Sequence, residues 1–386
     1  MNFKGYRRPD GRAGIRNHIL ILPCSLCASE TARFTASLVP GAVYIPNQGG
    51  CAIVKKDFEM TLEVLSGYAA NPNVYGTVVI GNTCEQVQAH LLVEKIKEKT
   101  NKPVESVVIR DVGGTIKAVE IAARYATQMS RDASKLVKED IDISELIMAT
   151  ECGGSDPTSG LAANPVVGKV SDRLVDIGAT VILSETSELV GTEDILAPRC
   201  KDKETAERLL HIIKRNEEHF ERAGEFLRFG NPSTGNKEGG LTTLEEKSLG
   251  CIHKAGERTI MDVFDYGQMV TSKGLVVMDT PGQDIASIAA MVAGGAQIVI
   301  FTTGRGTPTG NGLVPVIKVT GNSETAKLMA DNIDFDASPV LTEGKETDEL
   351  GGELFDLMMR VVNGEKSKAE ALGFNDVSMA RECNFC

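Results

Sequence analysis

Residues 74–109 read VYGTVVIGNTCEQVQAHLLVEKIKEKTNKPVESVVI and decide the fold class. Val74–Ile80 is a short apolar run rich in β-branched residues, which predicts a buried strand. Glu85–Lys99 carries apolar residues at helical spacing, and Val104–Ile109 is a second β-branched run. A strand, a helix and another strand of these lengths predict a βαβ unit, whose two strands are parallel.

The same alternation extends to both sides of this unit. The other elements expected in the first part of the chain are strands at His18–Leu22 and Ala42–Ile45 and helices at Ser25–Ser37, Asp57–Tyr68 and Thr115–Met129. Residues 130–144 are charged and polar, so we expect them to connect two domains. The chain is therefore predicted to be an α/β protein with domains at residues 1–135 and 145–386.

The second part of the chain repeats the α/β pattern. The expected strands are Leu146–Ala149, Thr180–Leu183, Gly274–Met278, Gln297–Phe301 and Val314–Val319, and the expected helices are Pro165–Ile177, Lys203–Phe229 and Ile285–Val292. Gly230–Leu241 is rich in Gly, Asn, Pro and Ser, which predicts a loop.

Composition narrows the classes of function. The 386 residues include 41 Lys and Arg against 53 Asp and Glu, a formal charge of −12, which argues against nucleic acid or an anionic membrane as the main partner. A small anionic substrate stays possible, because local charge can oppose the global sign. The longest apolar runs fall far short of the roughly 20 residues of a membrane helix, and no secretory signal is visible. We therefore expect a cytoplasmic protein.

Three of the nine cysteines follow predicted strands. Cys51, Cys84 and Cys152 each stand in a glycine-containing turn after a strand. Ligands bind at the carboxyl ends of parallel strands, where glycine lets the backbone approach them. Three such thiols could converge on one metal ion or iron–sulfur centre and leave a position open for substrate. The alternative is that each thiol is a small buried hydrophobic side chain.

Two further cysteine pairs have CxxC spacing. Cys24 and Cys27 stand at a predicted strand-to-helix junction, where such a pair resembles a redox centre, and Cys383 and Cys386 close the chain. Both spacings can also be incidental, so we assign neither pair a role.

Cationic and polar side chains near glycines are candidates for binding an anion. Arg16 precedes a buried strand, Asn236 and Lys237 lie in the Gly-rich loop, and Arg305 follows a buried strand in Thr302–Thr307. Arginine forks suit carboxylate or sulfonate groups. A solvated segment or an exposed turn is the alternative. No Walker or dinucleotide signature is present.

Several long motifs, taken together, resemble the altronate/galactarate dehydratase family. They are Gly11-Arg-Ala-Gly-Ile-Arg-Asn17, Asn71-Pro-Asn-Val74, Gly81-Asn-Thr-Cys-Glu85, Glu151-Cys-Gly-Gly-Ser-Asp156, Ser159-Gly-Leu-Ala-Ala-Asn-Pro165, Ile182-Leu-Ser-Glu-Thr186, Gly230-Asn-Pro-Ser233 with Gly235-Asn-Lys237, Met278-Asp-Thr-Pro-Gly282 and Phe301-Thr-Thr-Gly-Arg-Gly306. These motifs are distributed over nearly the whole chain, and they occur in the same order as in the family.

The resemblance implies a fold, a chemistry and a partner. Members of the family are iron-requiring lyases acting on hydroxy acids, with a dimerising α/β second domain and a C-terminal domain that is a Rossmann-like variant with a metal site. Full-length members begin with a small β-clip domain that is not found here. The chain therefore resembles the large subunit of a split enzyme that pairs with a small β-clip (SAF-like) subunit and forms a homodimer.

One departure concerns the substrate. The first cysteine turn of sugar-acid dehydratases carries histidine, whereas residues 46–52 here read PNQGGCA. The large subunit of sulfolactate sulfo-lyase, which eliminates sulfite, is a related split enzyme, and Asn71-Pro-Asn-Val-Tyr-Gly76 resembles that branch. The expected function is dehydration of altronate or galactarate, with sulfite elimination from sulfolactate as the alternative. A non-catalytic metal-binding scaffold is a second alternative.

Position within these motifs assigns a role to each candidate residue. We expect Cys51, Cys84 and Cys152 to hold the iron, as Fe²⁺ or as an iron–sulfur cluster. We expect Lys237, Asp156 and Glu185 to act as base or acid. The expected substrate anchors are Arg305, Asn236, Ser155 and Arg16.

Overall fold

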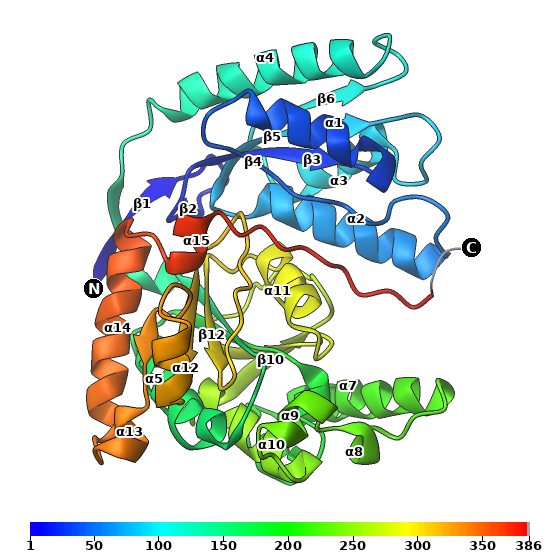
Figure 1. Cartoon of the computed structure of the whole chain (residues 1–386). Coiled ribbons are helices and arrows are strands. Elements are labelled where there is room, and N and C mark those ends of the chain that lie inside the picture. Colours follow the sequence, from blue (N-terminus) through cyan, green and yellow to red (C-terminus); the bar gives the residue numbers. More distant parts are fainter. Residues whose placement is uncertain (384–386) are drawn as a thin grey trace.

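The computed structural model describes residues 1–383 and contains two parallel sheets joined by helices (Figure 1). Within these residues the first sheet has the strand order β4–β3–β5–β6. Its elements are β3 (His18–Pro23), β4 (Ala42–Tyr44), β5 (Val74–Gly81), β6 (Val104–Val108), α1 (Leu26–Ser37), α2 (Lys55–Ala70), α3 (Ala89–Lys99) and α4 (Thr115–Ala133). Helices α1 and α4 pack on one face, and α2 and α3 on the other. The βαβ prediction from residues 74–109 is confirmed, since β5 and β6 pair in parallel.

The second sheet has the order β10–β11–β9–β8–β12–β13–β14 in the described part of the chain, and all its neighbours are parallel. Its strands are β8 (Ile147–Cys152), β9 (Thr180–Leu183), β10 (Ile260–Phe264), β11 (Gly274–Met278), β12 (Ile298–Thr303), β13 (Val316–Thr320) and β14 (Phe335–Asp336). The longer helices around it are α5 (Asn164–Asp176), α7 (Lys203–Arg222), α10 (Leu244–Ile252), α11 (Asp284–Ala293) and α14 (Thr347–Asn363). The shorter ones are α6 (Glu193–Leu196), α8 (Leu227–Gly230), α9 (Thr234–Glu238), α12 (Ser323–Leu328), α13 (Pro339–Thr342) and α15 (Lys368–Leu372), with a π-helical turn at Ser159–Ala163.

A small antiparallel sheet changes the expected connection between the domains. Residues 130–144, expected only to link them, contain β7 (Glu139–Asp142), which pairs with β1 (Asn2–Arg7). On its other side β1 pairs with β2 (Ala13–Gly14). The pairing buries apolar side chains. Phe3 of β1 and Ile141 of β7 belong to the same hydrophobic core as α5 and the face of the seven-stranded sheet that α5 covers. The first residues of the chain thus pack against the second domain.

The two sheets share one continuous core. Helices α2 and α11 pack face to face, and a Cβ on Gly67 of α2 would lie 2.5 Å from the carbonyl oxygen of Ala293. Beside this contact, the Asn71 amide donates to the carbonyl oxygens of Val292 and Ala296, both at 2.8 Å. Close backbone packing and buried hydrogen bonds therefore fix the two sheets relative to each other.

Three boundaries differ from the sequence expectation for local reasons. The helix expected over Lys203–Phe229 ends at Arg222, because Gly224 adopts φ +84° and turns the chain. The expected loop at Gly230–Leu241 contains the short helix α9. The helix expected from Glu85 begins at Ala89, after a turn that carries Cys84. No helix in residues 1–383 is long and apolar enough to cross a membrane.

Candidate active site

A cavity of about 780 Å³ opens over the carboxyl ends of β8, β9 and β11. Cys152 ends β8, Glu185 lies just after β9, and Asp284 begins the helix that follows β11. The segment between α7 and α9 covers the opposite wall. Since ligands bind where parallel strands end, the strand order of the sheet places the cavity where chemistry is expected.

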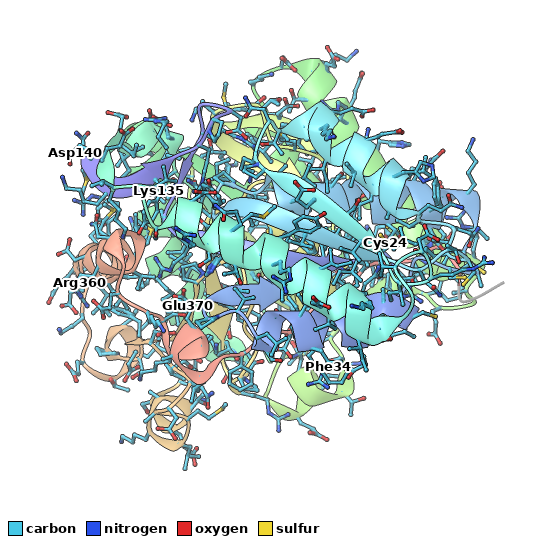
Figure 2. The ribbon with its side chains drawn as sticks, turned by 90° about the horizontal axis from the view of Figure 1, so that it is seen from above. Cys24, Phe34, Lys135, Asp140, Arg360 and Glu370 are labelled. Carbon is cyan, nitrogen blue, oxygen red and sulfur yellow. The ribbon has the colours of Figure 1, made fainter. Side chains whose placement is uncertain are left out.

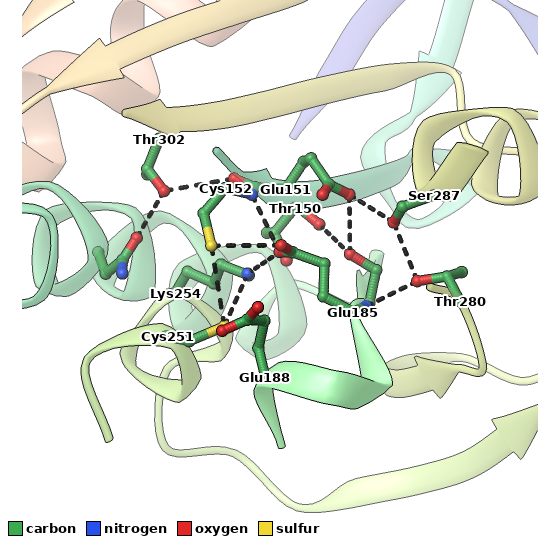
Figure 3. A network of polar contacts seen from close by, with 12 residues as sticks. Thr150, Glu151, Cys152, Glu185, Glu188, Cys251, Lys254, Thr280, Ser287 and Thr302 are labelled. Carbon is green, nitrogen blue, oxygen red and sulfur yellow. Dashed lines mark hydrogen bonds and ion pairs between the residues drawn. The ribbon is translucent and has the colours of Figure 1, made fainter. Parts of the chain in front are cut away.

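Three side chains that could hold a metal ion, Cys152, Glu185 and Cys251, come together beside this cavity (Figure 3). Cys152 and Glu185 line it, and Cys251 lines the smaller cavity next to it. The Cys152 Sγ lies 3.9 Å from the Cys251 Sγ and 3.4 Å from a Glu185 carboxylate oxygen. All three donor atoms lie within 4.8 Å of one another, and all three residues are buried. Two sulfurs and one carboxylate oxygen are a donor set that suits a transition metal.

Lys254 places a positive charge beside these donors. Its side chain is 0% exposed, forms an ion pair with Glu185 and lies 3.0 Å from the Cys251 Sγ. Burial disfavours the ammonium, but the neighbouring thiols and carboxylates outweigh burial and raise the pKa of Lys254 well above its usual value. Lys254 is therefore the partner of the Glu185 carboxylate within the cluster.

The backbone of Glu185 adopts an unusual conformation that aims its carboxylate at the cluster. Its φ of +65° is in the left-handed region, which a non-glycine residue adopts at a cost of about 1 kcal/mol or more. The Glu185 amide donates to the Thr280 hydroxyl at 2.7 Å, and the carboxylate accepts from the Cys152 amide at 3.0 Å. These contacts from β8 and from the end of β11 hold the strained residue in place.

A buried carboxyl group, Glu151, and a half-buried one, Asp284, lie near the cluster. Burial, followed by the charge of Glu185, raises the pKa of Glu151 well above its usual value, and Glu151 accepts hydrogen bonds from Ser184 and Ser287. Burial and the charge of Glu185 also raise the pKa of Asp284 to about 7. A Cβ on Gly153 would lie 2.1 Å from an Asp284 carboxylate oxygen, so glycine makes room for this carboxyl group.

Glu188 presents an unpaired oxygen to the cavity. One carboxylate oxygen accepts from Lys247 at 2.8 Å, whereas Oε2 is buried and has no partner in the described part of the chain. Both residues line the cavity. This oxygen is therefore free to accept a hydrogen bond or to contact a cation.

The structure brings three of the predicted substrate anchors into the wall of the cavity. Ser155, Asn236 and Arg305 all line it. The Asn236 amide donates to the Ser155 carbonyl oxygen at 3.1 Å, and Arg305 donates to the Gly235 carbonyl oxygen at 2.6 Å. The Arg305 side chain is 47% exposed, and its guanidinium also forms an ion pair with the exposed Glu238 at 3.3 Å.

Arg16, expected to bind substrate, instead holds the chain together. Its guanidinium forms a two-pronged ion pair with Glu370 at 2.8 and 2.9 Å and also donates to the Val361 carbonyl oxygen. Arg16 does not line the cavity, because it joins the segment before β3 to α14 and α15.

Two of the expected acid–base residues do not belong to the cluster, although Asp156 lines the smaller cavity beside Cys152 and Cys251. Asp156 is saturated by hydrogen bonds from its own turn, through Thr158 and Ser159, and from Asn322, so it orders the loop after β8. Lys237 is exposed on α9 and is not among the lining residues. Of the three, Glu185 alone joins the cluster.

The expected set of three metal-binding cysteines is divided between the two sheets. Cys51 and Cys84 lie together beyond the carboxyl ends of the four-stranded sheet, where the Cys51 Sγ is 3.9 Å from the Cys84 carbonyl oxygen. Cys152 ends a strand of the other sheet and has Cys251 as its neighbour. In residues 1–383 no compact group of ligands contains all three. Cys24 is buried and Cys27 is exposed, whereas Cys386 lies outside the described residues.

Sequence reasoning missed Cys251, Lys254, Lys247 and Glu188. One local signal existed, since Cys251 and Lys254 are three residues apart and face the same side of one helical segment. Their distance of about 100 residues from Cys152 hid the relation between them.

Comparisons with known proteins match both domains of the chain. A sequence model described as "D-galactarate/Altronate dehydratase, C-terminal" matches residues 143–384, and one described as "D-galactarate dehydratase/Altronate hydrolase, second domain" matches residues 5–134.

Three relatives illustrate the range of the similarity. The (2R)-sulfolactate sulfo-lyase subunit beta of Chromohalobacter salexigens is 37% identical over 98% of this chain and 97% of its own length. The altronate dehydratase of Bacillus subtilis is 33% identical over 98% of this chain and 77% of its length. The galactarate dehydratase (L-threo-forming) of Escherichia coli is 34% identical over 94% of this chain and 73% of its own length. With both domains matched and relatives above 30% identity along nearly the whole chain, this protein belongs to the D-galactarate/altronate dehydratase family.

Proposed function

We propose that this chain is the large subunit of an iron-dependent lyase that removes a β-substituent from a small anionic hydroxy acid. The similar proteins are named dehydratases and a sulfo-lyase, so the enzyme class is a carbon–oxygen or carbon–sulfur lyase. The buried group of Cys152, Glu185 and Cys251 beneath an open cavity is the observation that carries the proposal.

The donor set fits iron in charge and in chemistry. Two thiolates and one carboxylate carry three negative charges, and Lys254 supplies one positive charge. The remaining two negative charges match a divalent ion. Sulfur and carboxylate donors suit Fe²⁺ or the iron of a cluster, and the unpaired Glu188 oxygen is a further group that could face a bound ligand. When bound there, iron would supply a Lewis acid that stabilises charge developing on the substrate.

The other steps fall to residues of the cavity wall. We propose that Arg305 and Asn236, which both line the cavity, bind the substrate carboxylate. Arg305 also donates to the Gly235 carbonyl oxygen and pairs with Glu238. We propose Asp284 as the base that takes the α-proton, because its carboxyl group faces the cavity beside Gly153 and ionises near pH 7. Glu185 then serves as a metal ligand paired with Lys254 rather than as the base.

Dehydration of a sugar acid such as altronate or galactarate is the first reaction that we propose. Elimination of sulfite from (2R)-sulfolactate is the second, and one observation favours it: the chain is 37% identical to the sulfo-lyase subunit but 33–34% identical to the dehydratases. Both reactions need the same α-proton abstraction and differ in the group that leaves.

A partner subunit and a dimer complete the proposal. The name "subunit beta" of the sulfo-lyase relative supports an enzyme of several chains. We propose a small β-clip subunit as the partner, a homodimer formed through the domain at residues 5–134, and a Rossmann-like variant at residues 143–384.

The test is an anaerobic assay of the iron-loaded chain with and without the small subunit on altronate, galactarate and (2R)-sulfolactate. The proposal expects a 2-keto acid from the dehydration substrates or sulfite from sulfolactate, with activity lost in Cys152→Ala. A chain that binds iron but supports no elimination with any partner would be a metal-binding scaffold, and the proposal would fail.

A further inference from the structure

An ion pair between Lys247 and Glu188 lies in the wall of the larger cavity. Figure 2 shows Asp140 and Arg360 at the edge of the molecule, and the side chains of the ion pairs that these two residues form are 48–61% exposed. The Lys247 and Glu188 side chains are only 12% and 4% exposed. Because taking two charges out of water is unfavourable, stability alone does not account for a buried pair at this place.

Three elements of the chain meet at this pair. Lys247 lies on α10 four residues before Cys251, so one face of the helix carries both side chains. Glu188 ends the 3₁₀ turn that follows β9, and Asn231 follows α8 in the segment that covers the cavity. Lys247 also lines the smaller cavity. The pair therefore stands where the two cavities adjoin, next to the proposed metal ligands.

The two side chains leave one hydrogen-bond donor and one acceptor unused. The Lys247 ammonium has three hydrogens and donates to Glu188 Oε1 at 2.8 Å and to the Asn231 side-chain oxygen at 3.1 Å, so one hydrogen has no acceptor within residues 1–383. The Asn231 amide donates to the same Oε1 at 3.5 Å, whereas the buried Oε2 accepts from no residue in this range. Figure 3 shows the Glu188 carboxylate turned toward Cys251.

The charges of the pair support each other. Burial lowers the pKa of Lys247, but the charge of Glu188 and its hydrogen bond outweigh burial and raise this pKa above its ordinary value. Burial raises the pKa of Glu188, and the charge of Lys247 opposes that rise. Lys247 is thus a cation, and the ion pair as a whole carries no net charge.

A hydroxyl group matches the two unused positions. A hydroxyl has one hydrogen to donate and lone pairs that accept, so it can donate to Glu188 Oε2 and accept from Lys247 at the same time. Both positions are within reach of one oxygen atom, because Oε2 belongs to the carboxylate that binds Lys247. A carboxylate or sulfonate only accepts hydrogen bonds, and the charge on Glu188 would repel it.

We propose that Lys247 and Glu188 bind a hydroxyl group of the substrate and that Asn231 positions Lys247. This inference rests on the proposed lyase function and adds the feature by which the cavity distinguishes a hydroxy acid from the same acid without its hydroxyl groups. Sugar acids and (2R)-sulfolactate all carry a hydroxyl, so the inference applies to both classes of substrate. The anionic groups of the substrate are left to Arg305, which lines the same cavity.

Matched ligands test the inference on the iron-loaded full-length chain. Adipate is galactarate without its hydroxyl groups, and 3-sulfopropionate is sulfolactate without its hydroxyl. The substrate that the wild type converts is compared with its deoxy counterpart, which is measured as a competitive inhibitor. Glu188→Gln should lower kcat/KM for the substrate about ten-fold or more, because the amide of Gln cannot accept the hydroxyl hydrogen while its oxygen binds Lys247. The inhibition constant of the deoxy counterpart should change by less than about two-fold.

Two further proteins complete the test. The double variant Lys247→Met, Glu188→Gln leaves neither charge buried alone, so it should fold and show the same selective loss. Glu225→Gln is the matched control, since Glu225 lines the cavity but is exposed, and it should change neither constant.

The outcomes separate this inference from the lyase function. If Glu188→Gln weakens substrate and deoxy inhibitor equally, or weakens neither, the pair does not bind a hydroxyl, although the lyase function stands. If the wild type converts none of the acids, the lyase function fails, and calorimetry of the metal-free chain with galactarate and adipate then decides. Tighter binding of galactarate that is lost in Glu188→Gln would support the inference, and equal affinities in the wild type would overturn it.

Discussion

Replacing Lys254 by methionine tests the buried cluster most sharply. The substitution keeps the length of the side chain but leaves the Glu185 carboxylate buried without its cation. Removing one partner of a buried ion pair costs about 3–5 kcal/mol, which is about a thousand-fold in the ratio of folded to unfolded chain. We therefore expect Lys254→Met to lower the free energy of unfolding of the metal-free protein by about 3–5 kcal/mol.

The assay is chemical denaturation of four proteins: the wild type, Lys254→Met, Glu185→Gln and the double variant. If the pair acts as described, the double variant should be more stable than the sum of the two single losses allows, because neither residue is then left buried with an unpaired charge. Excess Fe²⁺ or Zn²⁺ should reduce the loss in Lys254→Met, since a divalent ion can compensate Glu185.

Lys102→Met is the matched control. Lys102 is also buried, but its amine donates to the carbonyl oxygens of Asn71 and Val74. Lys102→Met should lower the free energy of unfolding by the same amount in the wild type and in Glu185→Gln. A loss below about 1 kcal/mol for Lys254→Met, or additive losses in the double variant, would refute the reasoning.

Four further substitutions have expected outcomes. Asp284→Asn should keep its iron and lose about a hundred-fold or more in kcat, whereas Lys237→Ala should keep its turnover; the opposite result would make Lys237 the base. Gly153→Ala should lower kcat with little loss of expression, because its Cβ would displace the Asp284 carboxylate; crystals with Asp284 unmoved would contradict this. Burial opposes ionisation of Asp10, but hydrogen bonds from Arg12 and Thr100 outweigh it and lower the pKa of Asp10 to about 2. The unfolded value is about 3.9, so this stabilisation is present above pH 4 and is lost as the pH falls toward 2. Asp10→Asn should therefore cost about 1–2 kcal/mol at pH 7, after allowance for solvent screening, and nothing near pH 2; a cost independent of pH in denaturation curves would contradict the assignment.

The sequence predicts the fold well where local patterns decide it. The β-branched runs at Val74–Ile80 and Val104–Ile109 are strands, and their pairing is parallel, because a helix between them returns the chain to the same edge of the sheet. The exception is the N-terminus. Its pairing with β7 joins residues more than 130 positions apart, for which no local pattern gives a signal.

The site is predictable only in part for the same reason. Cys152 and Glu185 stand at strand ends, so position alone marks them as candidates. Cys251 reaches Cys152 because α10 packs against the π-helical turn, where a Cβ on Gly160 would lie 3.0 Å from the Gly250 Cα. Gly160 and Gly250 have no side chains, and this allows the close approach. Their contact belongs to the tertiary structure, so no local sequence pattern reveals it.

Arg16 shows how a distant partner can change the interpretation of a motif. Its place among glycines before a strand indicated a ligand, but Glu370, 354 residues away, takes up its charge. An arginine in a motif can serve either a substrate or a distant carboxylate, and the sequence alone does not distinguish the two.

Iron and acid-labile sulfide per chain, measured on anaerobically purified protein, test the central claim most directly. Wild type and Cys200→Ser should contain the same iron, and Cys152→Ala and Cys251→Ala should each contain about one site's iron less. Sulfide in proportion to that iron would identify a cluster, and iron without sulfide would identify an Fe²⁺ ion. Iron that stays at the wild-type level in a folded Cys251→Ala protein would contradict the metal site beside the cavity.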